Sequence, residues 1–205
     1  MQQIADTKER IFDAFVELAS ESGYENVTTR DIARRIGINA ASIYYHFESK
    51  ERILEFAYDY YMLYEFEKRN SIGRMKKLIE AMSLEEVIYG FFYKFAEDDR
   101  KKYVRMTLIA KIIYMRIYQD SRANSIFLEG IKNSAEYAKE VLQHGIDAGR
   151  LDPSFDIEAF ADILIDAASM MVIRTFAESD YTAGQGEREK HIHALLTTLL
   201  KTAVL

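Results

Sequence analysis

Two tyrosines and a histidine stand side by side in the sequence, at residues 44–46 (YYH). Tyrosine can pack and hydrogen-bond at once, and no nucleophile with its base accompanies these three side chains. His191 and His193 are two residues apart on a predicted helix, so they point to different sides and chelate a metal poorly. Cysteine is absent, which excludes disulfides, thiolate metal sites and cysteine nucleophiles. The sequence therefore predicts a protein that is not an enzyme and has neither a metal nor a cofactor.

Helices must position these side chains, because apolar residues recur at helical spacing throughout the chain. One proline and nine glycines in 205 residues leave few helix breakers. An all-α fold is therefore expected. The predicted helices cover residues 7–22, 29–36, 40–47, 49–69, 83–97, 103–118, 126–148, 156–178 and 187–203, with approximate ends.

Charge is unevenly distributed along the sequence. The net charge of −6 argues weakly against a general polyanion binder, but residues 28–50 hold four basic and two acidic residues. This basic window can still approach phosphates, because salt confines the interaction to about 10 Å. The first ten residues show no signal-peptide pattern, and no apolar stretch approaches the roughly 20 residues of a membrane helix. We expect a cytoplasmic protein without membrane contact.

Capping residues define the first three helices. Asp6 with Glu9 forms a capping-box pattern before the first helix, whose apolar stripe is Ile11, Phe12, Phe15, Val16, Leu18 and Ala19. Thr28 is the predicted N-cap of the second helix, Gly37 its end, and Asn39 the N-cap of the third.

The second and third helices are very short, and short helices are marginal alone in water. A helix-turn-helix explains them: one helix braces the other, which enters the DNA major groove. Ala33 and Gly37 provide the small residues and the turn, and isoleucines fill the inner positions. An ordinary helical hairpin in a bundle is the alternative.

Residues 28–51, TTRDIARRIGINAASIYYHFESKE, resemble the N-terminal domain of the TetR family of transcriptional regulators. The apolar stripe of the first helix, Gly23 and Tyr24 extend the match back to about Thr7. The resemblance implies an N-terminal three-helix helix-turn-helix domain over residues 1–49. It also implies a larger helical effector-binding and dimerisation domain over residues 50–205.

The resemblance also implies which residues touch DNA. Those expected at phosphates are Thr28 and Thr29, where helix-terminal amides favour an anion, and Lys50. Those expected near base edges or backbone are Asn39, Ala40, Ala41, Ser42, Tyr44, Tyr45 and His46. Ala40 stands where many members of the family carry lysine or arginine, although alanine can pack on a thymine methyl. Alternatively, Tyr44 is partly core and His46 merely exposed.

A second copy of the chain is expected, because a recognition helix of about seven residues spans only about three or four base pairs. Residues 159–173 carry only Asp162 and Asp166 as charges, so this helix is apolar nearly all round and needs cover on both sides. The resemblance implies a four-helix bundle with a symmetry mate on a palindromic DNA operator. The expected dimer residues are Phe160, Leu164, Ala168, Met171, Leu195, Leu196 and Leu199. The alternative buries both helices within one subunit.

The middle of the chain is rich in aromatic residues, among which the family places an effector pocket. Most such residues are ordinary core. The expected pocket residues are Tyr61, Tyr64, Phe92, Phe95, Tyr114, Tyr118 and Met170. Arg105 and Arg116 lie on nearly the same helix face and are expected to be solvated, or one of them to pair with an acidic effector.

Together these features predict a homodimeric, sequence-specific regulator that binds double-stranded DNA and acts as a repressor. A small, largely apolar or aromatic-compatible effector of unknown identity would release it by tilting the helix that begins at Lys50. Two alternatives remain at this point. One is a constitutive DNA-binding regulator without an effector, and the other is a helical binding protein or enzyme that has lost DNA binding.

Overall fold

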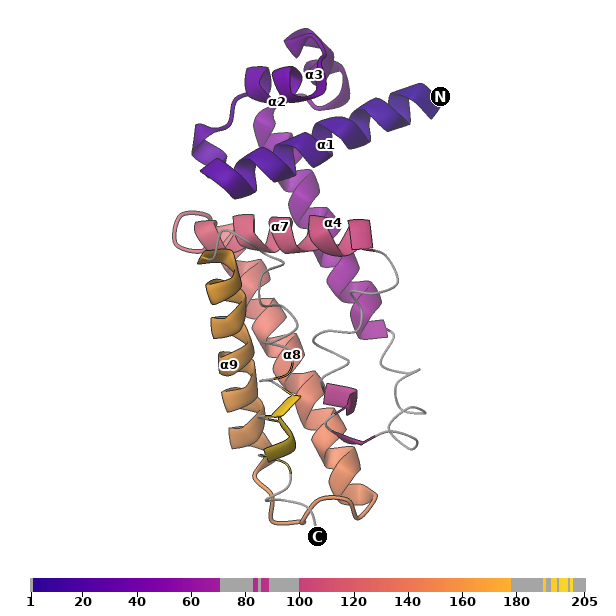
Figure 1. Cartoon of the computed structure of the whole chain (residues 1–205), viewed down its shortest axis with the longest axis vertical. Coiled ribbons are helices and arrows are strands. Elements are labelled where there is room, and N and C mark those ends of the chain that lie inside the picture. Colours follow the sequence, from indigo (N-terminus) through magenta and orange to yellow (C-terminus); the bar gives the residue numbers. More distant parts are fainter. Residues whose placement is uncertain are drawn as a thin grey trace. The chain divides into compact units, whose positions relative to one another are not determined.

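The regular structure of the chain is helical. The computed structural model describes residues 2–70, 83–84, 86–88, 100–177, 190, 193–194, 196–198 and 200, and these contain no strand. The helices are α1 (Gln2–Ser22), a 3-10 turn η1 (Tyr24–Asn26), α2 (Thr29–Ile36), α3 (Ala40–His46), α4 (Lys50–Asn70), α7 (Arg100–Arg116), α8 (Ser121–Asp147) and α9 (Ile157–Ala177) (Figure 1). Within this part of the chain, no helix is both long and apolar enough to cross a membrane.

The chain divides into two compact units, each with its own hydrophobic core. Unit 1 comprises Met1–Glu67 and Asp99–Phe127, and unit 2 comprises Lys68–Asp98 and Leu128–Leu205. The core of unit 1 draws on α1 to α4, on α7 and on the first turns of α8. The helix-turn-helix thus shares one core with α4 and α7, whereas the predicted boundary between residues 49 and 50 stays a prediction.

The apolar stripe of α1 forms the centre of unit 1. Ile11, Phe12, Phe15, Val16 and Ala19 are buried, as their spacing predicted, and Leu18 is partly buried. The predicted start of this helix is wrong, because α1 begins at Gln2 instead of after Asp6. Asp6 is exposed, so its carboxylate stays in water while the helix continues through it.

The ends of α2 follow the predicted signals. Thr28 and Asp31 form a reciprocal capping box at its start. Gly37 ends it in the left-handed conformation, with φ at +71°. The amide of Ile38 donates to the carbonyl of Ala33 at 3.0 Å, and the Gly37 amide donates to Arg34 at 3.4 Å. This pair of bonds is a Schellman motif, and it turns the chain directly into α3, which Asn39 caps.

The start of α8 differs from the prediction. This helix begins at Ser121, five residues before the predicted start near Ile126. The Asp120 carboxylate accepts the amides of Arg122 at 2.9 Å and Ala123 at 3.2 Å, so it satisfies the free donors of the first turn. The prediction missed this cap because it placed the start at the apolar periodicity alone.

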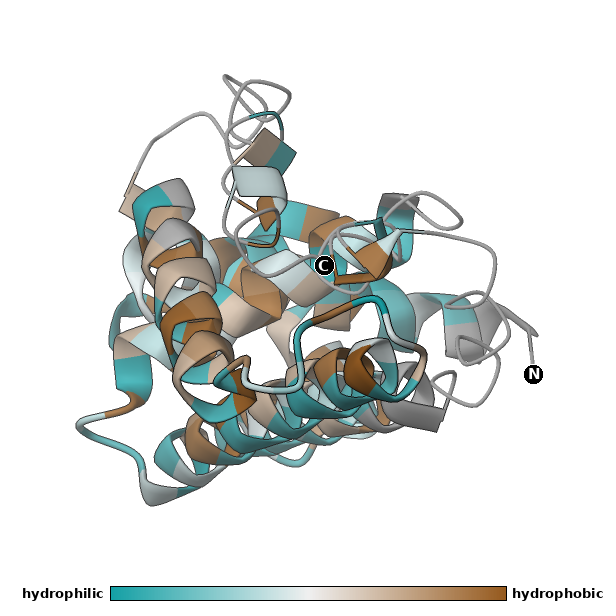
Figure 2. Cartoon of the chain, turned by 90° about the horizontal axis from the view of Figure 1, so that it is seen from below, coloured by the Kyte–Doolittle hydropathy of each residue, from teal (hydrophilic) through white to brown (hydrophobic). Residues whose placement is uncertain are grey.

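Unit 2 packs α9 against the later turns of α8. Its core includes Val141 and Leu142 of α8, Ala161 and Leu164 of α9, and Leu151 between the two helices. Hydrophilic (teal) and hydrophobic (brown) residues both occur along the helices in Figure 2. Lys139 and Glu158 add an ion pair between α8 and α9. Both α8 and α9 therefore bury one face in the core of unit 2.

Gly37→Ala should destabilise the protein, because an L side chain in the left-handed region costs roughly 1–2 kcal/mol. Urea unfolding should show a lower midpoint. Gly130→Ala is the matched control: this glycine lies inside α8, and nothing lies within 4 Å of an added Cβ. A helical alanine should leave the midpoint equal or higher. Equal effects of the two substitutions would contradict this account of the turn.

Candidate nucleic-acid interface

The short helix α3 buries one side and exposes the other. Ile43 is fully buried, and Phe47, which follows the last turn, is 6% exposed. On the opposite side Tyr44 is 55% exposed and Tyr45 is 75% exposed. A helix of seven residues is marginal alone, so its direction depends on this burial against α1 and α2. The two tyrosines are therefore held outward by the packing beneath them.

The N-terminus of α2 lies next to these tyrosines. The hydroxyl oxygens of Thr29 and Tyr44 are 3.3 Å apart, so one donates to the other. Thr28 is committed to the helix cap: its hydroxyl donates to the Asp31 carboxylate at 2.5 Å and accepts the Asp31 amide. Hydrogen bonds from Thr28 lower the pKa of Asp31. Of the two threonines expected at a phosphate, Thr29 is the one outside the cap.

The other predicted residues of α3 lie around the exposed tyrosines. Asn39 and Ala41 are exposed, and Ala40, Ser42 and His46 are partly exposed. The side-chain oxygen of Asn39 accepts the Ala41 amide at 2.9 Å, which is the N-cap bond of α3. The His46 ring meets the Tyr45 ring edge-on, with centroids 5.2 Å apart. The fold thus brings the predicted residues of α2 and α3 together on one side of the helix-turn-helix.

Lys50, at the start of α4, already has an acceptor inside unit 1. Its ammonium donates to the carbonyl of Tyr24 at 3.0 Å and lies 4.1 Å from the centroid of the Tyr24 ring. The Tyr24 hydroxyl donates to Glu51 at 3.1 Å. Burial, together with Glu51, raises the pKa of Tyr24 to about 12. Lys50 therefore ties α4 to η1, whatever else it contacts.

Arg116 continues this network at the end of α7. Its guanidinium carbon lies 4.3 Å from the centroid of the Tyr24 ring, and its nitrogens pair with Glu25 and with Asp120. The Asp120 carboxylate also accepts the Tyr58 hydroxyl at 3.0 Å. The arginine side chain is 12% exposed, so the expectation that it is solvated is wrong. The carboxylates of Glu25 and Asp120 thus neutralise the charge of the mostly buried Arg116 side chain.

Arg105 makes a second clamp between α7 and α1. It pairs with Glu9 and with Asp13, each at 2.7 Å, and its side chain is also only 12% exposed. Its guanidinium lies over the rings of Phe12 and Tyr60. Arg105 and Arg116, which were expected to be solvated or, for one of them, to pair with an acidic effector, thus both pair with carboxylates of unit 1. The sequence pattern could not show this, because all of these carboxylates except Asp120 are more than 90 residues away in the chain.

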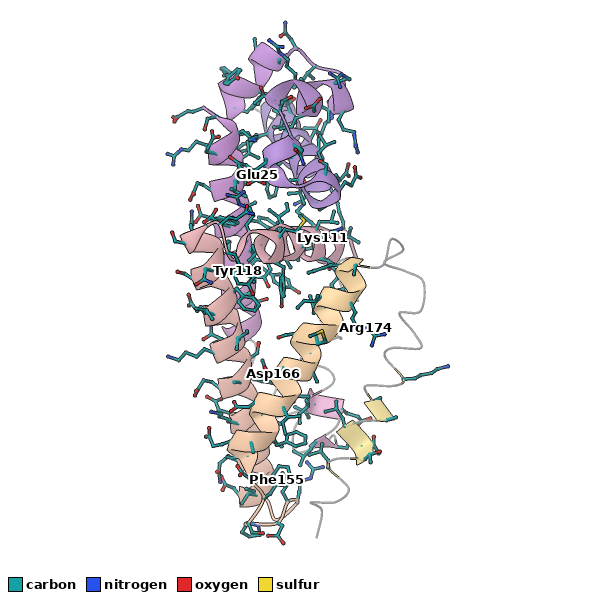
Figure 3. All side chains as sticks on the ribbon, turned by 90° about the vertical axis from the view of Figure 1, so that its left-hand side faces the viewer. Glu25, Lys111, Tyr118, Phe155, Asp166 and Arg174 are labelled. Atoms are coloured by element: carbon teal, nitrogen blue, oxygen red, sulfur yellow. The ribbon has the colours of Figure 1, made fainter. Side chains whose placement is uncertain are left out.

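The predicted pocket residues are distributed unevenly. Tyr61, Tyr64 and Tyr114 are partly buried on α4 and α7, and burial raises the pKa of both Tyr61 and Tyr64. Tyr118, labelled in Figure 3, is 94% exposed in the turn after α7, and Met170 is 57% exposed on α9. Phe92 and Phe95 lie outside the described residues.

The predicted dimer residues are also divided. Leu164 and Leu196 are buried in the core of unit 2, and Phe160 and Ala168 are partly buried. Leu195 and Leu199 lie outside the described residues, as does the side chain of Met171. A different set on α9 is exposed: Ile163 is 62% exposed, Met170 57% and Ile173 44%.

Among the described residues, no group of three or more His, Asp or Glu side chains could hold a metal ion. An all-helical chain in which a seven-residue helix is braced by an eight-residue helix across a left-handed glycine defines a helix-turn-helix protein. A family model for bacterial regulatory proteins of the tetR family matches residues 11–56. The match spans the helix-turn-helix and ends within α4, so this part of the chain is similar to the tetR family of bacterial regulatory proteins.

Similar proteins agree with this assignment. The biofilm operon icaADBC HTH-type negative transcriptional regulator IcaR of Staphylococcus aureus strain Newman is 35% identical over 99 residues, 48% of this chain and 50% of that protein. The protein of the same name from Staphylococcus epidermidis is 31% identical over 103 residues, with the same two shares covered. The chain thus matches these relatives over about half of their length.

Solved structures show the same fold over nearly the whole chain. A putative transcriptional regulator from Saccharomonospora viridis in complex with choline superposes with a TM-score of 0.65 at 16% identity, over 98% of both chains. The fatty acid degradation regulator FadR from Bacillus halodurans gives a TM-score of 0.56 at 19% identity, over 92% of this chain and 96% of that one.

Asp31→Asn should remove a pH-dependent part of the stability of α2. Because the folded-state pKa of Asp31 is lowered, its contribution is present above its ordinary value of 3.8 and is lost as pH falls through the folded value. Urea unfolding should show the parent protein more stable than the variant at pH 6, with the gap closing toward pH 3. Thr28→Ser, which keeps the capping hydroxyl, should differ from Asp31→Asn in the same pH-dependent way as the parent protein does. A gap that is constant with pH would contradict this role of Asp31.

Proposed function

We propose that the chain is a homodimeric repressor that binds a palindromic operator in double-stranded DNA and is released by a small effector. The observation that carries DNA binding is the arrangement of α3, in which Tyr44 and Tyr45 are exposed above buried Ile43 and Phe47. The pair of hydroxyls at Thr29 and Tyr44 lies at the N-terminus of α2, where backbone amides and the helix dipole favour a phosphate. The name of the IcaR relatives, a negative regulator, supports repression.

The predicted DNA-contacting residues divide into two roles in this proposal. Thr29 and Tyr44 bind the phosphate backbone, while Tyr45, Ser42, Ala40 and Ala41 face base edges in the major groove. Lys50 has its acceptor on Tyr24 and approaches phosphates only with its remaining N–H groups. The proposed contact surface is therefore mainly uncharged. In this proposal the affinity for the operator depends on two subunits that each bind one half-site.

Tyr45→Ala should weaken binding to DNA from the chain's own upstream region by about 5- to 150-fold, since one good base contact is worth about 1–3 kcal/mol. A gel-shift series measures this change. Tyr118→Ala is the matched control, because Tyr118 is the more exposed tyrosine and lies in the turn after α7. It should leave the affinity unchanged. Equal losses in the two variants, or no loss in either, would contradict the proposed contact face.

The proposed dimer uses the exposed side of α9. Residues 159, 163, 166, 170, 173 and 177 follow each other at intervals of four and three, so they share one face of the helix. Ile163, Met170 and Ile173 make this face apolar. Asp166, labelled in Figure 3, is the acidic residue within it. Because the opposite side of α9 is occupied by α8, the exposed side is the one left for a second copy.

Ile163→Glu should separate the subunits, because it places a charge in the proposed apolar interface. Sedimentation equilibrium should change from twice the 23.8 kDa chain mass to the mass of one chain. Leu63→Glu is the control: Leu63 is 57% exposed but lies on α4. It should leave the dimer intact. A parent protein that sediments as a single chain would refute the dimer.

The proposed effector site lies in unit 1, where Tyr61 and Tyr64 of α4 and Tyr114 of α7 are partly buried. Partly buried tyrosines offer apolar faces with a few polar tips, which suits a small apolar or aromatic molecule. A ligand that favours one position of α4 would move Lys50 and Tyr24 with it, and through them the helix-turn-helix. Operator affinity that is unchanged by a bound effector would contradict this coupling.

A further inference from the structure

The proposed recognition helix, α3, has no lysine or arginine to present to a base. Its sequence is AASIYYH, and the side chains that it exposes most are those of Ala41, Tyr44 and Tyr45. The strongest contact to guanine in a major groove is a bidentate bond from arginine or lysine to O6 and N7. No residue of α3 can make that contact.

Three basic residues around α3 have a partner within unit 1, and a fourth, Arg30, is exposed on α2. Arg34 pairs with Asp31 at 3.1 Å, and Arg35 pairs with Glu17 and Glu21 at 3.2 and 3.3 Å. Lys50 donates to the carbonyl of Tyr24. These three cations therefore stabilise the helix-turn-helix, and Arg30 lies on α2, the supporting helix.

Adenine readout is also restricted. The bidentate contact to adenine uses both the oxygen and the nitrogen of an Asn or Gln side chain. Asn39 stands at the start of α3, but its side-chain oxygen accepts the Ala41 amide at 2.9 Å as the helix cap. The hydroxyls of Ser42, Tyr44 and Tyr45 can bond to more than one base, so they discriminate poorly.

Apart from these hydroxyls and the His46 ring, which lies edge-on to Tyr45, the exposed side of α3 is apolar. It consists of the methyl groups of Ala40 and Ala41 and the ring faces of the tyrosines. The one apolar group that a base pair displays in the major groove is the C5 methyl of thymine. Building on the proposed function, we infer that each operator half-site is recognised through thymine methyl groups, so that the bases beneath α3 are A·T pairs. Guanine contacts contribute little to the specificity.

Replacement of thymine by uracil tests this inference, because it removes only the methyl group. The protected half-sites are first located by footprinting on the chain's own upstream region. Uracil at the thymines beneath α3 should weaken binding about fourfold for each buried methyl group. A second duplex of the same sequence carries 7-deazaguanine, which lacks the N7 acceptor, in place of guanine. This substitution should leave the affinity unchanged.

A double-mutant cycle that combines the uracil substitution with replacement of Tyr45 tests whether α3 makes the methyl contact. In Tyr45→Ala the uracil penalty at one thymine of each half-site should disappear, whereas Tyr45→Phe, which keeps the ring, and Tyr118→Ala should retain it. Affinity that is insensitive to uracil but falls more than tenfold with 7-deazaguanine would overturn the inference and leave DNA binding intact. Binding to no duplex would overturn the proposed function itself, and the inference with it.

Discussion

Burial of Ile43 and Phe47 is the constraint on which the proposed interface depends. A seven-residue helix contributes little stability of its own, so packing against α1 and α2 decides where its two sides point. The Schellman turn at Gly37 and the caps at Thr28 and Asn39 hold that packing in register. With one side of α3 fixed inside unit 1, Tyr44 and Tyr45 have no alternative to the surface.

Several charged side chains of unit 1 form ion pairs and cation–π contacts between its own helices. Arg105 and Arg116 clamp α7 to α1 and η1, and Lys50 and Arg116 lie over the same tyrosine ring. The helix-turn-helix is therefore fastened to α4, α7 and the start of α8 by buried or half-buried cations. The sequence of α3, AASIYYH, contains no Lys, Arg, Asp or Glu, and in the proposed function this helix selects DNA through thymine methyl groups.

Local signals in the sequence predicted the fold well where the residues that matter are neighbours. The caps of α2 and α3, the left-handed Gly37 and the buried stripe of α1 all follow from patterns shorter than about 12 residues. The pairs Arg105–Asp13 and Arg116–Glu25 join residues about 90 positions apart, so no local pattern contains them. Similarly, periodicity showed that α9 is apolar nearly all round, but only the packed structure shows which side α8 covers.

The most direct test of the account is photocross-linking to an operator that carries 5-iodouracil in place of thymine. The iodine occupies the position of the methyl group in the major groove, so it reacts with a side chain that touches that position. The account predicts that digestion and mass spectrometry locate the cross-link at Tyr45. Cross-links that map to residues outside α2 and α3 would contradict it.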